Sequence, residues 1–181
     1  MANFKQIIPF VKKWEGGFSD HPNDRGGATN QGITWANFVA YAPKLGYPPD
    51  WQLFMQMPDY IWERIFKTQY WDAVQGDHIQ SQAVAGLLVD FAWGSGPGTA
   101  VMHLQRVLNQ HFGTRLVVDG GMGPLTLAAT NRAPARALFQ ALFQAREQFL
   151  HAIIARDPSQ AVFRTGWFNR TRDLYERLKN W

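Results

Sequence analysis

The sequence predicts a mainly α-helical fold that includes a short loop or hairpin near the N-terminus and a helical subdomain at the C-terminus. Three observations support this fold class. Apolar residues recur at helical spacing along most of the 181-residue chain. Five glycines and one proline interrupt this pattern between residues 16 and 32, where no regular helix fits. A second interruption, Gly-Ser-Gly-Pro at residues 94–97, indicates a subdomain boundary.

In the N-terminal half, residues of known capping preference mark where the helices begin. Asn3 and Thr34 are suited to cap helices, and Pro58 is suited to the first turn of a third. The consecutive prolines before Trp51 break the chain. The expected elements are a helix over 3–14, a loop or short hairpin over 16–32, a helix over 34–44 and a helix over 58–68.

The C-terminal half contains more helices joined by glycine-rich turns. The expected helices cover 81–93, 98–112, a segment opening at Pro124, 134–156 and 166–180. A short extended piece over 116–118 leads into a turn at Asp119 and Gly120, which is interpreted either as a ligand loop or as a turn that closes a helical packing unit. We expect two regions, 1–93 and 94–181, packed into one globular unit.

Composition excludes several classes of protein. The chain has no cysteine, so disulfides, iron–sulfur clusters, thiolate zinc sites and a cysteine nucleophile are excluded. No 18-residue apolar run and no cationic leader followed by an apolar run occurs, so neither a membrane span nor a secretory signal is expected. No phosphate-binding loop is found, and Asp20, His21 and Asp24 are too sparse a set for a metal. We therefore expect no cofactor and no metal.

Positive charge is concentrated in the second half of the chain. Residues 1–90 hold seven basic and nine acidic side chains, whereas residues 91–181 hold eleven and five. A basic half can be attracted to nucleic acid, to an anionic membrane or to an anionic wall polymer, but no nucleic-acid motif is present. The segment 166–180 either touches an anionic membrane or covers the core as an amphipathic lid. Its basic residues are Arg170, Arg172, Arg177 and Lys179.

Two carboxylates and a hydroxyl border the glycine-rich loop. Glu15 follows the first expected helix, where the negative end of the helix dipole favours a protonated carboxyl, as a general acid requires. Asp24 stands nine residues later and could activate a water that the hydroxyl of Thr29 holds in line. Such a pair of carboxyl groups is the machinery of glycoside hydrolysis. The alternative is a solvated surface turn without chemistry.

The loop sequence closely resembles that of a known family. Residues 15–34, with Glu-Gly-Gly-Phe followed by Pro-Asn-Asp-Arg-Gly-Gly-Ala-Thr-Asn-Gln-Gly-Ile-Thr, resemble the opening motif of family-108 glycoside hydrolases, which are lysozyme-like N-acetylmuramidases of the phage endolysin type. Residues 69–72 and 90–97 look like two further elements of this family. Residues 118–126 look like the start of its associated peptidoglycan-binding module. Phe18 and Gly94 depart from the pattern, because tyrosine and asparagine are expected there.

The resemblance implies a lysozyme-like fold and a set of sugar-binding residues. Tyr70 and Trp71 would stack on sugar rings and Asp72 would bind hydroxyls, although an aromatic pair at a helix end is equally typical of a core. Asp90 belongs to the second of the matching elements and is also expected to bind substrate. Trp35 and Trp93 lie on apolar helical faces, where burial accounts for them.

The expected function is that of a monomeric peptidoglycan hydrolase. Glu15 would be the acid, Asp24 the base and Thr29 the assisting hydroxyl in cleaving the β-1,4 bond between N-acetylmuramic acid and N-acetylglucosamine, with inversion if the carboxyl groups lie about 6.5–9.5 Å apart. The rival hypotheses are a lytic transglycosylase that uses Glu15 alone and a non-catalytic wall-binding or secretion-associated protein. We expect delivery to the wall through holin-like pores or a secretion system.

Overall fold

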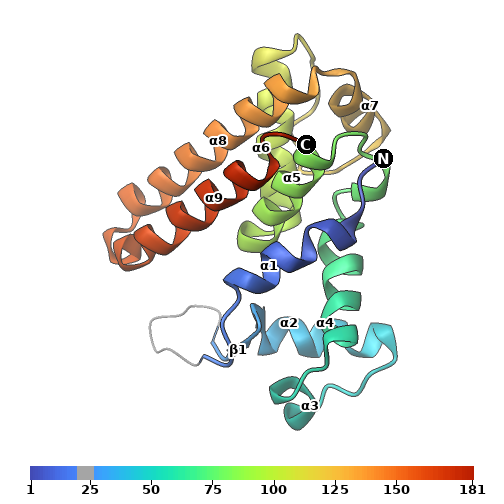
Figure 1. Ribbon diagram of the computed structural model, residues 1–181, viewed down its shortest axis with the longest axis vertical. Coiled ribbons are helices and arrows are strands. Elements are labelled where there is room, and N and C mark those ends of the chain that lie inside the picture. The colour runs from blue at the N-terminus through green and yellow to red at the C-terminus, as the bar shows by residue number, and fades with distance from the viewer. Residues whose placement is uncertain (20–26) are drawn as a thin grey trace. The chain divides into compact units, whose positions relative to one another are not determined.

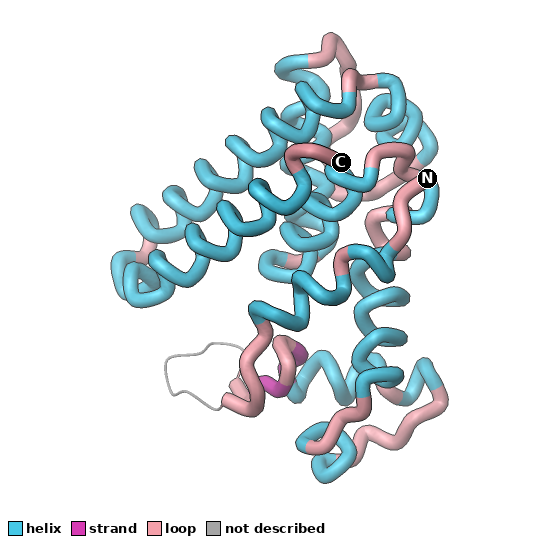
Figure 2. The backbone as a smooth tube through the Cα atoms, in the orientation of Figure 1, coloured by secondary structure: helices cyan, strands magenta, loops and turns pink. Residues whose placement is uncertain are grey.

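The computed structural model describes residues 1–19 and 27–181, and the described part is mainly α-helical with one two-stranded hairpin (Figure 2). The mainly α fold class is therefore confirmed. Contacts divide the chain into two compact units. The N-terminal unit is formed by residues 5–69, and the C-terminal unit by residues 1–4 together with 70–181.

The N-terminal unit contains four α-helices and the hairpin in its described residues (Figure 1). Thr34 caps α2 as expected, because its side chain accepts a hydrogen bond from the backbone N–H of Asn37 at 3.2 Å. The elements are η1 (Phe4–Gln6), α1 (Ile8–Trp14), β1 (Thr29–Asn30), β2 (Ile33–Thr34), α2 (Trp35–Tyr41), η2 (Pro43–Leu45), α3 (Trp51–Met55) and α4 (Asp59–Phe66).

Two of these elements differ from the sequence-based expectation. The first α-helix begins at Ile8 rather than near Asn3, and the preceding residues form a 3-10 turn. Pro9 explains this start, because proline lacks an N–H and is tolerated in the first turn of a helix but not in its interior. The short helix α3 was not expected. Asp50 initiates it, because its carboxylate accepts a hydrogen bond from Leu53 N–H at 2.8 Å.

The hairpin is a tight antiparallel pair that ends the glycine-rich loop. Thr29 pairs with Thr34 and Asn30 with Ile33, so only Gln31 and Gly32 form the connection. Both have positive φ angles, 49° and 77°, as the most favourable two-residue hairpin turns require. Gln31 adopts this conformation although it has a side chain, so the neighbouring structure must hold it in place.

The C-terminal unit is built around α5, in which every residue from 83 to 92 is buried. This helix packs against α6, α8 and α9 (Figure 1). Its uniform burial agrees with a sequence that is apolar on all sides. The elements of this unit are the π-helical turn η3 (Lys67–Trp71), which begins in the other unit, η4 (Gly76–His78), α5 (Gln82–Ser95), α6 (Pro97–His111), α7 (Pro124–Arg132), α8 (Ala135–Arg156), η5 (Pro158–Phe163) and α9 (Arg164–Leu178).

The first residues of the chain belong to the C-terminal unit. Ala2 N–H donates to the carbonyl of Ile79 at 2.9 Å, and Asn3 exchanges two hydrogen bonds with the side chain of Gln82. The break at residues 94–97 lies within this same unit, where Gly96, at φ 83°, separates α5 from α6. The division into regions 1–93 and 94–181 stays a prediction.

The turn at Asp119 and Gly120 is organised by one buried side chain. The amide of Gln105, 1% exposed, donates to the Asp119 carboxylate at 2.8 Å and accepts from Gly120 N–H at 3.0 Å. The hydrogen bond from Gln105, followed by that from Gly121 N–H, lowers the pKa of Asp119. These contacts favour the interpretation of a turn that closes a packing unit.

Replacing Gly120 with alanine is expected to destabilise the protein by at least about 1 kcal/mol, because its φ of 77° is unfavourable for alanine and the added Cβ would lie 2.8 Å from the carbonyl oxygen of Gly98. Gly166→Ala is the matched control. Gly166 lies in α9 with open space around its Cβ position, so alanine there should be neutral or slightly stabilising. Urea denaturation measures both, and equal stabilities of the two variants would contradict the role given to this turn.

Candidate active site

Glu15 lies at the boundary between a helix and the glycine-rich loop. It is the C-cap of α1, with extended backbone angles, and its N–H donates to the carbonyls of Val11 and Lys12 at 3.1 and 3.2 Å. Its side chain is partly exposed. Gly16 and Gly17 follow, and a Cβ at either would meet no atom within 4 Å. The backbone directly after Glu15 therefore borders open space in which a bulky substrate has room.

Thr29 lies on the returning arm of the same loop. An isolated β-bridge joins it to Ser19. Ser19 N–H donates to the carbonyl of Thr29 at 2.8 Å, and Thr29 N–H donates to the carbonyl of Ser19 at 2.7 Å. The Thr29 hydroxyl donates to the carbonyl of Gly27 at 3.0 Å. The bridge therefore pairs Thr29 with a residue that follows Glu15 by only four positions in the sequence. Asp24, the expected base, lies outside the described residues.

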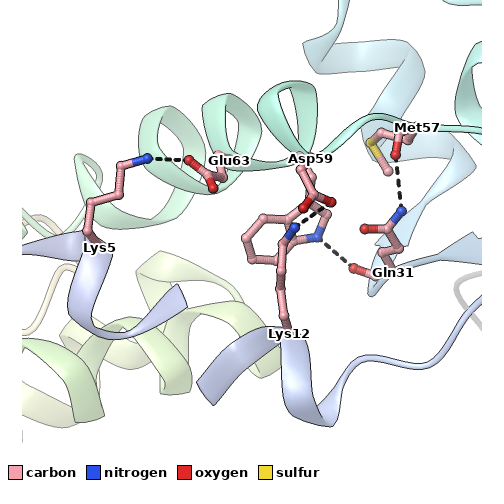
Figure 3. Close-up of polar contacts among 7 residues, drawn as sticks. Lys5, Lys12, Gln31, Met57, Asp59 and Glu63 are labelled. Atoms are coloured by element: carbon pink, nitrogen blue, oxygen red, sulfur yellow. Dashed lines mark hydrogen bonds and ion pairs between the residues drawn. The ribbon is translucent and has the colours of Figure 1, made fainter. Parts of the chain in front are cut away.

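Helix α4 braces α1, the helix that carries Glu15 (Figure 3). Lys5, just before α1, pairs with Glu63, and Lys12 in the last turn of α1 pairs with Asp59 at 2.6 Å. The Lys12 ammonium also lies over the indole of Trp62, 5.1 Å from the ring centroid. Partly exposed ion pairs contribute little stability, so buried apolar side chains hold α1 in place. Those of α1 are Ile8, Phe10 and Val11.

The same helix and the segment before it hold the hairpin. Trp62 Nε1–H donates to the carbonyl of Gln31 at 2.8 Å, and the Gln31 side chain donates to the carbonyl of Met57 at 3.1 Å (Figure 3). Asn30, 4% exposed, donates from its amide to the carbonyls of Phe54 and Met55 at 2.6 and 3.1 Å. These bonds hold the unusual turn at Gln31 and thereby fix Thr29, two residues away.

The aromatic residues expected to bind sugars are largely buried. Trp71 has no exposed surface, its indole N–H donates to Asp77 at 2.7 Å, and its ring lies against the backbone of Gly76. Tyr70 is 7% exposed and contacts the ring of Trp93. A ring without exposed surface offers no face to a sugar in this conformation, so both residues pack as core. Only Asp72 is exposed.

Asp90, also expected to bind substrate, is fully buried and paired with two arginines. Its Oδ1 lies 2.7 Å from Nη2 of Arg170, and its Oδ2 lies 3.3 Å from Nη2 of Arg146. Burial lowers the pKa of Arg146 and repulsion from Arg170 lowers it further, while the Asp90 charge opposes both. The three side chains join α5, α8 and α9. In the described structure, this carboxylate serves the helix packing.

The departure at Gly94 occurs beside this cluster. A Cβ at Gly94 would lie 3.4 Å from Nη2 of Arg146, so any side chain there would stand next to the guanidinium. Nε and Nη1 of Arg146 are buried without a hydrogen-bond partner. An asparagine, which the family pattern predicts at this position, would offer an amide oxygen to the same group. The departure at Gly94 therefore lies within contact distance of the buried ion cluster.

Helix α9 covers the core in the way that the lid interpretation predicts. Phe168, Thr171, Leu174 and Leu178 are its buried residues. Arg170 is part of the Asp90 cluster, and Arg172 lies 3.8 Å from Glu147. No helix among the described residues is long and apolar enough to cross a membrane. Contact of α9 with a membrane surface stays a prediction.

Within residues 1–19 and 27–181, no group of three or more acidic or histidine side chains is placed to hold a metal ion. Asp20, His21 and Asp24, which were considered for that role, lie outside these ranges.

Comparison with known proteins defines the class of protein. The glycosyl hydrolase 108 family matches residues 8–96, and the domain described as Predicted Peptidoglycan domain matches residues 99–172. The chain belongs to glycosyl hydrolase family 108, so it is a glycoside hydrolase with a C-terminal domain of the peptidoglycan-binding type.

The chain is also similar to a solved structure, that of SagA from Brucella abortus. The two chains are 32% identical, the match covers 97% of this chain and 92% of SagA, and the TM-score is 0.79. No curated protein matches the chain.

Proposed function

We propose that the protein is an N-acetylmuramidase, with a lysozyme-like catalytic region, that hydrolyses the β-1,4 bond between N-acetylmuramic acid and N-acetylglucosamine in peptidoglycan. One observation carries the proposal: Glu15 ends α1 directly before two glycines that border open space, on a loop whose return is paired at Ser19 and Thr29. The family supplies the reaction class, glycoside hydrolysis, and the C-terminal domain supplies peptidoglycan as the expected ligand.

In the proposed mechanism, the Glu15 carboxyl group donates its proton to the glycosidic oxygen as the bond to the anomeric carbon breaks. Asp24 removes a proton from a water on the opposite face of the sugar, and that water adds to the anomeric carbon. The Thr29 hydroxyl is proposed to orient this water. The overall reaction consumes one water for each bond cleaved. It inverts the anomeric carbon if the two carboxyl groups leave room for the water between them.

The mass of the products tests this reaction. Purified peptidoglycan incubated with the wild-type protein is expected to release reducing muropeptides, each one water heavier than the corresponding anhydro product. Anhydro-muropeptides would contradict hydrolysis and identify a lytic transglycosylase, which needs Glu15 but no attacking water. NMR of the first-formed anomer then reports the stereochemistry, and retention would contradict the proposed role of Asp24 as a base.

A further inference from the structure

An open aromatic cluster lies on the N-terminal unit, on the glycine-rich loop and on helices α2 and α3. It consists of Phe18, Trp35 and Trp51, here called the aromatic platform. Phe18 and Trp51 are 43% and 46% exposed, and Trp35 is partly exposed. The ring centroids of Trp51 lie 6.1 Å from Phe18 and 5.0 Å from Trp35, so the three rings form one continuous surface. Contiguous exposed apolar surface of this kind marks a binding site more often than single exposed residues do.

The platform is rigid on its inner side. The ring of Trp35 stacks on Phe38 at 5.9 Å, and Trp51 contacts Phe54 at 5.4 Å. Phe38 and Phe54 are fully buried. Rings that are fixed from below and open above lose little conformational freedom when a ligand covers them.

The platform is tied to the loop by the backbone. Phe18 stands three residues after Glu15 and directly before Ser19, the residue bridged to Thr29. Trp35 N–H donates to the carbonyl of Ala28 at 2.7 Å, next to Thr29 on the other arm. Two of the three rings are therefore joined to the arms of the loop that carries the proposed acid and its assisting hydroxyl.

We infer that the aromatic platform binds the glycan strand and that Trp51 is its principal contact. The inference rests on the proposed function for the identity of this glycan. Each N-acetylated sugar of the strand has an apolar face of C–H groups and an acetamide methyl, which pack on aromatic rings, while its hydroxyls stay in water. A glycoside hydrolase that acts on a polymer holds several sugars of the strand, and contacts made equally in the ground state and in the transition state raise its affinity for the strand.

Binding of peptide-free glycan strands, prepared from peptidoglycan by amidase treatment, tests the platform. The parent protein is the full chain with Glu15→Gln, which prevents turnover. Adding Trp51→Ala is expected to raise Kd at least tenfold, whereas Trp51→Phe retains an aromatic ring and should raise it less than threefold. Tyr60→Ala is the matched control, because Tyr60 is an exposed aromatic residue of α4, 60% exposed and paired with Tyr47. It should leave Kd unchanged.

Phe18→Ala provides a second variant, since Phe18 lies in a loop and its loss threatens folding less than the loss of Trp51. It is expected to raise Kd at least threefold. In the otherwise wild-type protein, Trp51→Ala should raise KM for solubilised peptidoglycan and leave kcat within a factor of about three, a separation that a general loss of structure would not produce. Circular dichroism and thermal melting show which variants are folded.

The inference is overturned if the parent does not bind the glycan, or if folded Trp51→Ala and Phe18→Ala variants bind it as tightly as the parent. The first result would indicate that the rings contact another partner. Failure of the proposed function gives a different result. A wild-type protein that binds glycan through Trp51 but releases no reducing ends would support glycan binding by the aromatic platform and contradict the muramidase activity.

Discussion

Replacing Glu15 with glutamine is expected to reduce the rate of peptidoglycan hydrolysis by a factor of about 10²–10⁴, to the background of most assays. Glutamine keeps the size and the polar character of the side chain but has no proton to donate to the leaving oxygen. Glu15 is partly exposed and its helix is held by buried neighbours, so the free energy of unfolding should change by less than about 0.5 kcal/mol. Release of reducing ends and urea denaturation measure the two effects.

Glu63→Gln is the matched control for this experiment. It makes the same chemical change on α4, in a carboxylate that pairs with Lys5 in the same unit. Loss of this pair should cost less than about 1 kcal/mol and leave the rate of hydrolysis unchanged. A Glu15→Gln variant as active as the wild type would exclude Glu15 as the general acid.

Replacing Asp90 with alanine is expected to lower the free energy of unfolding by about 3–5 kcal/mol, because it removes the counter-ion of the buried Arg146 in the C-terminal unit. Arg146 is only 4% exposed, and two of its guanidinium nitrogens already have no hydrogen-bond partner. Asp59→Ala offers the contrast. Asp59 also forms an ion pair, with Lys12, but its side chain is 78% exposed, so its loss should cost less than about 1 kcal/mol.

The Asp90 variant also separates two roles for this residue. If Asp90 only joins α5, α8 and α9, the activity per folded molecule should remain near that of the wild type at a temperature where the variant is folded. If it binds substrate, as the family resemblance implies, that specific activity should fall. Equal unfolding free energies for the Asp90 and Asp59 variants would contradict the prediction that losing the buried carboxylate destabilises the protein more than losing the exposed one.

The fold was predicted best where a local signal is strong. The helix expected over 134–156 is α8, Ala135–Arg156, and the cap at Thr34 is present. The five-residue helix α3 is shorter than two helical turns, so no apolar periodicity could reveal it. The carboxylate of Asp50 before Trp51 was the only available signal.

The candidate site shows where sequence reasoning stops. The spacing of Glu15 and Thr29 about a glycine-rich loop is local information, and the structure places both on the arms of that loop. The burial of Trp71 and Asp90 depends on distant residues: Arg170 lies 80 positions after the carboxylate that it contacts. The aromatic platform was missed for the same reason, because its rings come from a loop and two helices that tertiary packing brings together.

The hydrogen bonds that attach the hairpin to its neighbours have side-chain donors and main-chain acceptors, and this difference affects which positions can vary in sequence. The side chains of Asn30, Gln31 and Trp62 donate hydrogen bonds to main-chain carbonyls at positions 31, 54, 55 and 57. Every amino acid offers such a carbonyl. During evolution, Met55 is therefore free to exchange its side chain without loss of the attachment, whereas Asn30, Gln31 and Trp62 are not.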